Sequence, residues 1–379
     1  MTLTPIEQIA AQGGPAADEV SGRFPVVVGV ETKPAAERDH LMADLRFGEV
    51  FSDHMARAVW RADSGWGERR LEAYGPKAMA PGASVLHYGQ EVFEGLKAYR
   101  HADGSVWTFR PTWNAARLNA SARRLALPEL SVEDFLASLV DLVRADVEWV
   151  PSEEGSTLYL RPFLYASESF LGVRAARTVT YDLIASPCGP YFKGGFHPVS
   201  IWVTDEYHRA AVGGTGAAKT SGNYAASLLP QLEAAERGFD QVCYLDSTNT
   251  HLEELGGMNV FVVARDGVVR TPALTGTILE GCTRNSIIQL LRDRGVDVRE
   301  EHIALDWLVE ALRSGEVTEM FACGTAAVVT AIGRLAGRGF DEQVGAGEPG
   351  AVTQSIYDEL TSIQLGKLPD RHGWLYRLA

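Results

Sequence analysis

Lys219 is the residue whose surroundings point most directly to chemistry. The residues before it, 213–218, are Gly, Thr and Ala, and those after it, 220–224, are Thr, Ser, Gly, Asn and Tyr. Such small neighbours let a ligand or another stretch of backbone approach closely. An amine that is removed from water in this way becomes a better nucleophile. Two chemistries use a lysine of this kind: phosphate binding in a P-loop, and Schiff-base formation with an aldehyde cofactor.

The segment 213–220 comes close to the P-loop pattern but departs from it at one position. A P-loop requires Gly immediately before the Lys, where backbone N–H groups wrap the phosphate. This chain has Ala218 there, and Gly222 then interrupts the helix whose N-terminus should face the phosphate. A nucleoside triphosphatase is therefore a weak alternative. A surface lysine in a Gly-rich turn is the other alternative when Lys219 is considered alone.

A Schiff-base lysine needs further groups if the aldehyde is pyridoxal phosphate. This cofactor requires a carboxylate for its pyridine nitrogen, a donor for its phenolic oxygen and a phosphate site, commonly a helix N-terminus. Glu254, in the segment 253–259, can supply the carboxylate. Two turns can supply the phosphate site, namely residues 281–284, which open an apolar helix, and residues 323–326, which follow a strand. Each feature is ordinary by itself.

Taken together, these motifs resemble the branched-chain amino-acid aminotransferases, which are fold-type IV pyridoxal-phosphate enzymes. The segments 213–224, 254–259 and 281–284 carry the resemblance, and the segments 87–99, 109–117 and 159–162 are similar to further motifs of that family. D-amino-acid aminotransferases and aminodeoxychorismate lyases share the fold type and are the nearest alternatives. The segments 109–117 and 159–161 favour the branched-chain family.

The resemblance implies a role for each cofactor-binding residue. Lys219 would form the Schiff base with pyridoxal 5′-phosphate and later move a proton at the substrate Cα. Glu254 would hold the pyridine nitrogen protonated, and Tyr224 would donate to the phenolic oxygen. The phosphate would lie against the side chains of Arg117 and Thr325 and the backbone N–H groups of Cys282 and Thr283.

The resemblance also implies a substrate pocket. Backbone N–H groups of Thr325 and Ala326 would bind the α-carboxylate, and Arg161 would help to accept the distal carboxylate of glutamate or 2-oxoglutarate. By pattern alone, Arg161 could instead be a structural ion-pair partner. The linker residue Tyr191 would cover the cofactor. The remaining aromatic residues, which by pattern could equally be core, would surround the substrate side chain: Tyr88, Phe93 and Tyr159.

The implied activity is a ping-pong transamination. L-leucine, L-isoleucine or L-valine would give its amino group to the cofactor, and 2-oxoglutarate would collect it to form L-glutamate. The family resemblance further implies a homodimer, with part of one chain near the neighbour's active site.

Composition limits the other classes of function. The 379 residues include 35 Lys and Arg against 49 Asp and Glu, which gives a net charge of −14 and disfavours nucleic acids and anionic membranes as partners. The four cysteines are widely separated, without the spacing of a zinc site, so we expect reduced thiols and no metal. The N-terminus lacks a signal-peptide pattern and no window is apolar enough to span a membrane, so we expect a cytoplasmic protein.

The chain is predicted to be a mixed α/β protein with a two-domain fold-type IV architecture and an active site between the domains. Residues 1–40 are expected to form a loosely held leader, apart from a strand at 24–30. Residues 41–190 would form a smaller α/β domain, 191–205 a linker, and 206–379 a larger cofactor-binding domain. Local patterns predict a helix that begins after Ser131, a helix over 224–237 and a hairpin around Asp266 and Gly267. Strands are predicted around 158–160, 178–185, 199–203 and 241–245.

Overall fold

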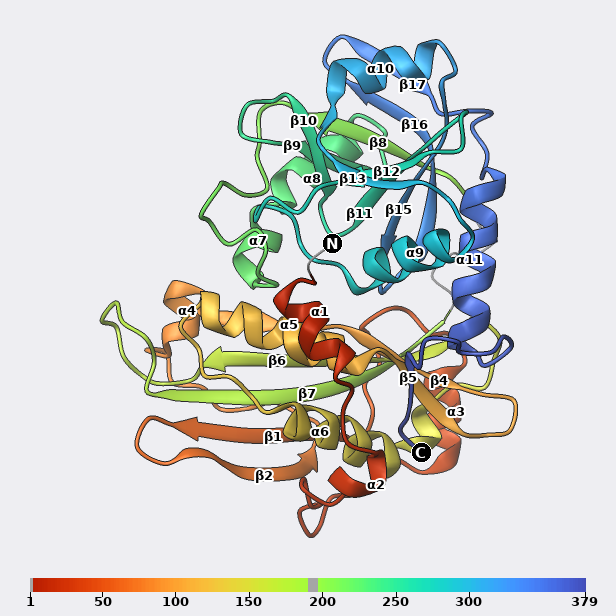
Figure 1. The fold of residues 1–379 in the computed structure, drawn as a ribbon. Helices are drawn as coiled ribbons and strands as arrows, with labels where there is room; N and C mark the ends of the chain where they lie inside the picture. Colours follow the sequence, from red (N-terminus) through yellow and green to blue (C-terminus); the bar gives the residue numbers. More distant parts are fainter. Residues whose placement is uncertain (1–2, 190–196) are drawn as a thin grey trace. The chain divides into compact units, whose positions relative to one another are not determined.

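The computed structural model describes residues 3–189 and 197–379, and these form two compact units (Figure 1). The first unit contains Met1–Tyr191, Ala218–Ser221 and Ser362–Ala379. The second contains Phe192–Ala217 and Gly222–Thr361. The short segment that carries Lys219 therefore groups with the N-terminal part of the chain, although its neighbours on both sides group with the second unit.

An antiparallel sheet forms the frame of the first unit. Its strands, in the order in which they lie side by side, are β18 (Leu375–Arg377), β5 (Val106–Phe109), β4 (Leu96–Arg100), β6 (Thr157–Ala166), β7 (Thr178–Cys188), β1 (His54–Arg61) and β2 (Gly65–Ala73). The short strand β3 (Glu91–Phe93) also pairs with β6. The strands predicted at 158–160 and 178–185 are confirmed as parts of β6 and β7.

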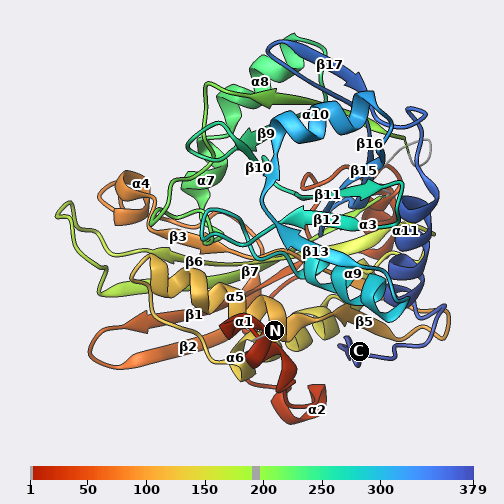
Figure 2. The same ribbon diagram turned by 45° about the horizontal axis from the view of Figure 1, so that its top comes forward.

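Helices α5 (Pro111–Arg124) and α6 (Val132–Ala145) lie side by side on one face of this sheet (Figures 1 and 2). Side chains alternate between the two faces of a strand. Leu158, Leu160 and Leu164 of β6 are accordingly buried in the core with these helices. Tyr159 and Arg161 must then point to the opposite face of the sheet. The predicted start of α6 is confirmed, because Ser131 Oγ accepts the N–H of Asp134 at 3.0 Å.

The predicted leader is more ordered than expected. It contains α1 (Pro5–Ala11), α2 (Ala17–Val20) and α3 (Ala35–Met42), and Val20 and Phe24 are buried in the core. The strand predicted at 24–30 is wrong, since only Val26 forms an isolated bridge, to Leu71. Val28 is 99% exposed and Gly29 adopts φ +89°, so the run of β-branched residues ends in a turn instead of continuing in the sheet.

A mixed sheet forms the frame of the second unit. In spatial order its strands are β13 (Val298–Glu301), β12 (Val269–Pro272), β11 (Asn259–Ala264), β15 (Val317–Gly324), β16 (Val328–Gly337), β8 (Val199–Thr204), β9 (Gln241–Leu245), β10 (His251–Leu255) and β14 (Ile303–Ala304). Strand β17 (Phe340–Gln343) pairs with β16. The predicted hairpin is confirmed by the antiparallel pairing of β11 with β12, and the strands predicted at 199–203 and 241–245 are confirmed as β8 and β9.

The helices of the second unit are shorter than the pattern predicted. They are α7 (Ser221–Ala225), α8 (Leu228–Glu236), α9 (Cys282–Asp293), α10 (Leu305–Arg313) and α11 (Ala351–Gln364), the first and last of which extend into the first unit. The helix predicted over 224–237 is confirmed as α8 over Leu228–Glu236, but it begins four residues later than predicted, and Tyr224 belongs to α7 instead. Pro230 explains the break between α7 and α8, because in a continuous helix its ring would clash with the carbonyl of Ala226.

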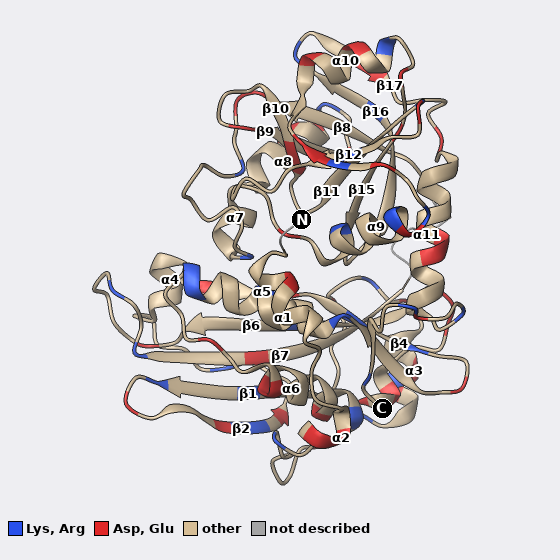
Figure 3. Cartoon of the chain, viewed as in Figure 1, with Lys and Arg blue, Asp and Glu red and all other residues tan. Residues whose placement is uncertain are grey.

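Charged residues of both signs are spread over both units (Figure 3). Within the described part of the chain, no helix is long and apolar enough to cross a membrane. In the same residues, no three or more His, Cys, Asp and Glu side chains are grouped so that they could hold a metal ion.

Candidate active site

The backbone around Lys219 is fixed by the first unit. Its N–H donates to Ser121 Oγ at 2.9 Å, and its carbonyl accepts the N–H of Phe93 at 3.0 Å. The next residue, Thr220, forms a bridge with Val92, so residues 219–221 run along β3 like a short extra strand. The peptide groups on both sides of the Lys219 Cα are thus bonded, which fixes the direction in which its side chain leaves the backbone.

One face of α5 supports this segment. Asn114, Arg117 and Ser121 are spaced by three and four residues, so they lie on the same side of the helix. Arg117 donates from Nε and Nη2 to the two carboxylate oxygens of Glu94, at 2.7 and 2.8 Å, and Asn114 adds a third bond at 2.8 Å. This buried cluster fixes the end of β3 to α5. Arg117 is therefore placed near the Lys219 segment, with one edge of its guanidinium bonded to Glu94.

Aromatic and basic side chains surround the Lys219 amine on the open face of the sheet. Lys219 Nζ lies 4.7 Å from the centre of the Phe93 ring, and the Arg161 guanidinium lies 4.9 Å from the same ring. Arg161 also donates to the Tyr159 hydroxyl at 2.9 Å. A Cβ atom at Gly95 would lie 2.0 Å from that hydroxyl oxygen, so only glycine leaves space for it. The structure brings together Lys219, Phe93, Tyr159 and Arg161.

Tyr88 has different neighbours. It ends the short helix α4 (Ser84–Tyr88), it is 44% exposed, and its hydroxyl donates to the carbonyl of Leu171. Exposed apolar side chains lie close in the sequence to both of these residues, namely Leu86 and Val173. Tyr191 lies outside the described residues.

Glu254 is the centre of the site residues in the second unit. It is 2% exposed, and its carboxylate is bonded by Arg209 at 2.9 Å, by the N–H of Leu279 at 2.8 Å and by the Asn259 amide at 3.2 Å. An arginine neighbour and several hydrogen bonds favour the charged form of a buried carboxylate. Sequence reasoning missed Arg209, which lies just upstream of the glycine-rich segment, and Asn259, which lies inside the matched motif.

Arg209 also connects Glu254 to the loop that carries Lys219. Its Nη1 donates to the carbonyl of Gly216 at 3.1 Å and to that of Thr277 at 2.9 Å. A Cβ atom at Gly216 would lie 2.3 Å from the Thr277 oxygen, so this approach requires glycine. The loop is closed further along by Asn223, whose amide donates to the carbonyl of Thr215 at 2.8 Å. Lys219 therefore lies at the middle of a loop whose two ends are held together.

Tyr224 and the turn after Glu254 are neighbours. Tyr224 lies in α7 and is half-buried, and a Cβ atom at Gly257 would be 3.7 Å from its Cε1. The turn that contains Thr325 and Ala326 lies against the same region, because a Cβ at Gly324 would lie 3.3 Å from Met258. The structure thus brings Tyr224, residues 256–258 and the 324–326 turn together.

Backbone strain lies at the start of β16, after the turn that contains Thr325 and Ala326. Val328, which follows it, adopts φ +62°, a conformation that β-branched residues rarely adopt. The strain persists because β15 and β16 remain paired on both sides, with Gly324 opposite Val328. Strained backbone of this kind tends to occur at binding sites.

The N-terminus of α9 is connected to the carboxylate of Glu254. Cys282 and Thr283 are buried in its first turn, behind Gly281 at the N-cap. A Cβ atom at Gly281 would lie 2.1 Å from the Asn259 side-chain oxygen, and the same side chain donates to Glu254. A glycine-capped N-terminus presents backbone N–H groups and the positive end of the helix dipole, which suits a phosphate.

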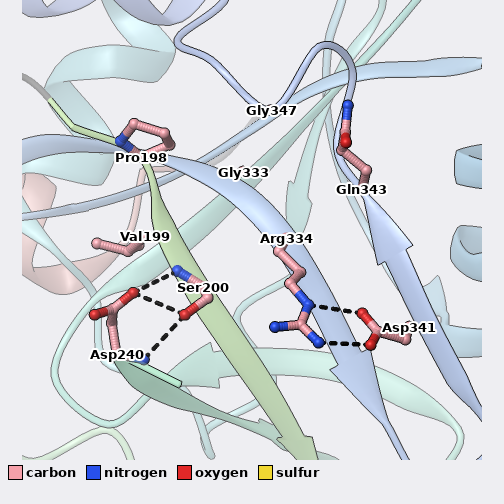
Figure 4. A pocket seen from close by; sticks show the side chains of 9 residues that line it. All are labelled: Pro198, Val199, Ser200, Asp240, Gly333, Arg334, Asp341, Gln343 and Gly347. Carbon is pink, nitrogen blue, oxygen red and sulfur yellow. Dashed lines mark hydrogen bonds and ion pairs between the residues drawn. The ribbon is translucent and has the colours of Figure 1, made fainter. Parts of the chain in front are cut away.

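A separate cleft of about 510 Å³ lies between β8, β16 and β17 (Figure 4). In this cleft Arg334 donates to both oxygens of Asp341 at 2.7 and 2.6 Å, and Asp240 accepts the Ser200 N–H at 2.8 Å. None of the predicted site residues lines this cleft. Its paired charges give it no role in the chemistry considered above.

Comparison with known proteins identifies the class. The profile of the family "Amino-transferase class IV" matches residues 91–335. Over 365 residues the chain is 49% identical to the "Branched-chain-amino-acid aminotransferase" of Mycolicibacterium smegmatis, with 94% of this chain and 99% of that protein covered. The chain therefore belongs to the class IV aminotransferase family, among its branched-chain-amino-acid aminotransferases.

Solved structures agree with this assignment. The branched-chain aminotransferase of the archaeon Thermoproteus uzoniensis, solved with norvaline, aligns with a TM-score of 0.71 at 28% identity, covering 86% of this chain and 100% of that one. The branched-chain amino acid aminotransferase of Escherichia coli aligns with a TM-score of 0.69 at 28% identity, covering 85% and 99%. The predicted family and the two-domain fold-type IV class are confirmed.

Proposed function

We propose that this protein is a branched-chain-amino-acid transaminase that uses pyridoxal 5′-phosphate. It would transfer the amino group of L-leucine, L-isoleucine or L-valine to 2-oxoglutarate, giving the branched-chain 2-oxo acid and L-glutamate. The main structural support is the buried Glu254, because the Arg209 that neutralises it also holds the loop leading to Lys219.

The residues of this chain fit the proposed cofactor. When bound, pyridoxal phosphate supplies an electron sink for the charge that develops at the substrate Cα. Glu254, kept charged by Arg209, would hold the pyridine nitrogen protonated, and Tyr224 would donate to the phenolic oxygen. The phosphate would be held by Arg117, by the Thr325 hydroxyl and by the α9 N-terminus at Cys282 and Thr283.

Lys219 would be the catalytic residue. Its Nζ would hold the cofactor through the aldehyde group, and the same amine would serve as the base that takes the proton from the substrate Cα. The bonds from Ser121 and Phe93 to its backbone support this role, because proton transfer requires a base held in one position.

The substrate pocket would serve two kinds of substrate in turn. Phe93 and Tyr159 would contact an aliphatic side chain, and Arg161 would bind the distal carboxylate of glutamate or 2-oxoglutarate. The contact of Arg161 with the Phe93 and Tyr159 rings supports this arrangement, since a cation held over aromatic rings lies at the edge of an apolar surface. The backbone N–H groups of Thr325 and Ala326 would bind the α-carboxylate.

We further propose a homodimer in the cytoplasm. Leu171 and Val173 are 64% and 88% exposed, and exposed apolar side chains of this size commonly mark a protein interface. Tyr88, which bonds to Leu171, would then reach the substrate from the partner subunit. The four cysteines are free and buried, as is usual in a reducing compartment.

An absorption spectrum tests the proposed function. The purified protein loaded with pyridoxal phosphate should show a visible band that shifts to shorter wavelength on addition of L-leucine and returns with 2-oxoglutarate. In Lys219→Ala, borohydride should no longer attach the cofactor covalently to the protein. Turnover should fall by at least ~1,000-fold, because the nucleophile and the base are lost together. A wild-type protein that binds no cofactor would contradict the proposal.

The same assay separates the alternatives. A D-amino-acid aminotransferase would respond to D-alanine and not to L-leucine, and an aminodeoxychorismate lyase would release pyruvate without needing 2-oxoglutarate. A nucleoside triphosphatase would hydrolyse ATP without any visible band.

A further inference from the structure

Glu91 contacts the residues that follow Lys219 through both its backbone and its side chain. Its carbonyl oxygen accepts the hydroxyl of Thr220 at 2.7 Å. Its carboxylate oxygen Oε2 accepts the backbone N–H of Ser221 at 3.1 Å. Glu91 begins β3, and β3 is held in the sheet by β6, with Glu91 opposite Tyr165. The two bonds therefore connect the Lys219 segment to a rigid strand.

These bonds complete the fixation of the lysine. Ser121 and Phe93 hold the two peptide groups of Lys219 itself, whereas Glu91 holds the two residues after it. Beyond Ser221 the chain enters the short helix α7 and leaves the first unit. Without the Glu91 carboxylate, Ser221 would lose its hydrogen bond to β3 at the point where the chain leaves the first unit, although the Thr220 hydroxyl would keep its bond to the Glu91 carbonyl. The segment after Lys219 would then be held less firmly, and the Cα–Cβ direction of Lys219 could rotate with it.

The carboxylate of Glu91 also lies in a cationic environment. Burial raises the pKa of Glu91, while the bond from Ser221 and the positive charges of Arg161 and Lys219 oppose that rise. Partly burying a carboxylate costs free energy of folding. A residue whose only role is packing would not need a carboxylate at this position.

We propose that Glu91 is a positioning residue for Lys219, holding the Thr220–Ser221 turn on β3 so that the lysine amine stays in its reactive position. This inference rests on the proposed function of Lys219. Glu91 is not among the residues proposed to contact the substrate. It acts through hydrogen bonds to the chain that carries the base, so its loss should affect turnover more than substrate binding.

Two substitutions at Glu91 separate the hydrogen bond from the charge. Glu91→Ala removes the acceptor for the Ser221 N–H, and kcat should fall by about tenfold, because small misplacements of a catalytic group are costly. The KM for L-leucine should stay within about twofold, as the substrate contacts are unchanged. Glu91→Gln keeps an acceptor oxygen and should restore kcat to within about threefold of wild type.

Two further variants complete the design. Thr220→Val removes the second bond without changing the size of the side chain, and it should lower kcat in the same direction as Glu91→Ala. If thermal unfolding shows that Glu91→Ala does not fold, Thr220→Val is used to test the inference instead. Asp103→Ala is the matched control, because the Asp103 carboxylate also accepts a backbone N–H, from Ser105 at 3.0 Å, in an exposed turn of the same unit. Its kinetics should match the wild type.

The outcomes are distinguishable. A kcat for Glu91→Ala and Thr220→Val equal to that of the wild type would overturn the inference. A Glu91→Gln variant as slow as Glu91→Ala would also overturn it, since the effect would then belong to the charge. A wild-type protein without a leucine-dependent change in its visible band would instead contradict the proposed function, before any variant is compared.

Discussion

Glu253 and Glu254 are adjacent residues of β10 with the same side chain and different surroundings. Glu254 is bonded by Arg209, Leu279 and Asn259, whereas Glu253 is bonded by the hydroxyl of Thr277, and burial raises the pKa of Glu253. Neighbouring residues of a strand point to opposite faces, so the two carboxylates face different surroundings, and only Glu254 faces Arg209 and Asn259. Sequence alone presented both as one acidic turn.

This difference gives a prediction for the pair. Glu254→Gln should lower kcat by ~100-fold or more, because a neutral amide no longer favours a protonated ring nitrogen. It should also destabilise the fold by about 3–5 kcal/mol, since Arg209 would remain buried without its charged partner. Steady-state kinetics and denaturant unfolding measure the two effects. Glu253→Gln is the matched control, and equal losses of activity in both variants would count against the assignment of Glu254.

Lys97 gives a pH-dependent prediction. Burial lowers the pKa of the Lys97 ammonium to about 8 from 10.5. The unfolded chain therefore binds more protons than the folded one between these values, so this residue destabilises the fold most below pH 8 and progressively less as the pH rises. Lys97→Met should raise Tm near pH 7, and the gain should shrink towards pH 10. Lys367→Met, at an exposed lysine paired with Glu154, should show no such trend.

At the scale of elements, a buried His–Asp pair connects the start of β1 to the end of α6. His54 Nδ1 and Asp146 Oδ1 are 2.7 Å apart, and the His54 backbone N–H donates to the same carboxylate at 2.9 Å. The hydrogen bond to Asp146 raises the pKa of His54, although burial opposes it. The pair therefore joins the sheet and a helix of the first unit through a titratable group whose pKa is raised.

The sign of this effect can be tested. A raised folded-state pKa means that the charged pair stabilises the fold fully below the unfolded value of 6.5, and that this contribution is lost as the pH rises through the folded value. Asp146→Asn should lower Tm at every pH because a buried hydrogen bond is lost. The Tm difference from wild type should be larger near pH 6 than near pH 9. A difference that grows with pH would show that His54 is not the group responsible.

At the scale of the whole molecule, the proposed homodimer depends on the apolar residues after β6. If Leu171 and Val173 lie in the interface, Leu171→Asp with Val173→Asp should convert the protein to a monomer, because burying two unpaired carboxylates is unfavourable. Sedimentation velocity measures the change. Activity should fall with it, since Tyr88 would no longer be held at the partner's site.

Val28→Asp provides the control for this experiment. Val28 is 99% exposed in the N-terminal segment, so the same chemical change there should leave the oligomeric state and the activity unaltered. A double variant at 171 and 173 that remains dimeric would place the interface elsewhere.

The sequence by itself determined the family and several local elements. Lys219, Glu254 and the 281–284 turn are residues that the proposed chemistry would require, and together they indicated the family without coordinates. Local signals also predicted elements whose hydrogen bonds are short-range, such as the Ser131 cap of α6 and the hairpin at Asp266 and Gly267. The prediction from sequence was wrong where a local preference was not matched by the tertiary structure. The β-branched residues around Val28 favour a strand, but they end in an exposed turn.

Only the tertiary structure decided how Lys219 is held. Three long-range features illustrate this, because each joins residues that are distant in the sequence. They are the attachment of Lys219 to β3 and α5, the pairing of Arg209 with Glu254, and the grouping of residues 218–221 with the N-terminal unit. Local propensity does not encode such contacts. An ion pair or an added strand forms only between the partners that the folded core brings within bonding distance. The sequence singles out Lys219, and long-range packing sets its position.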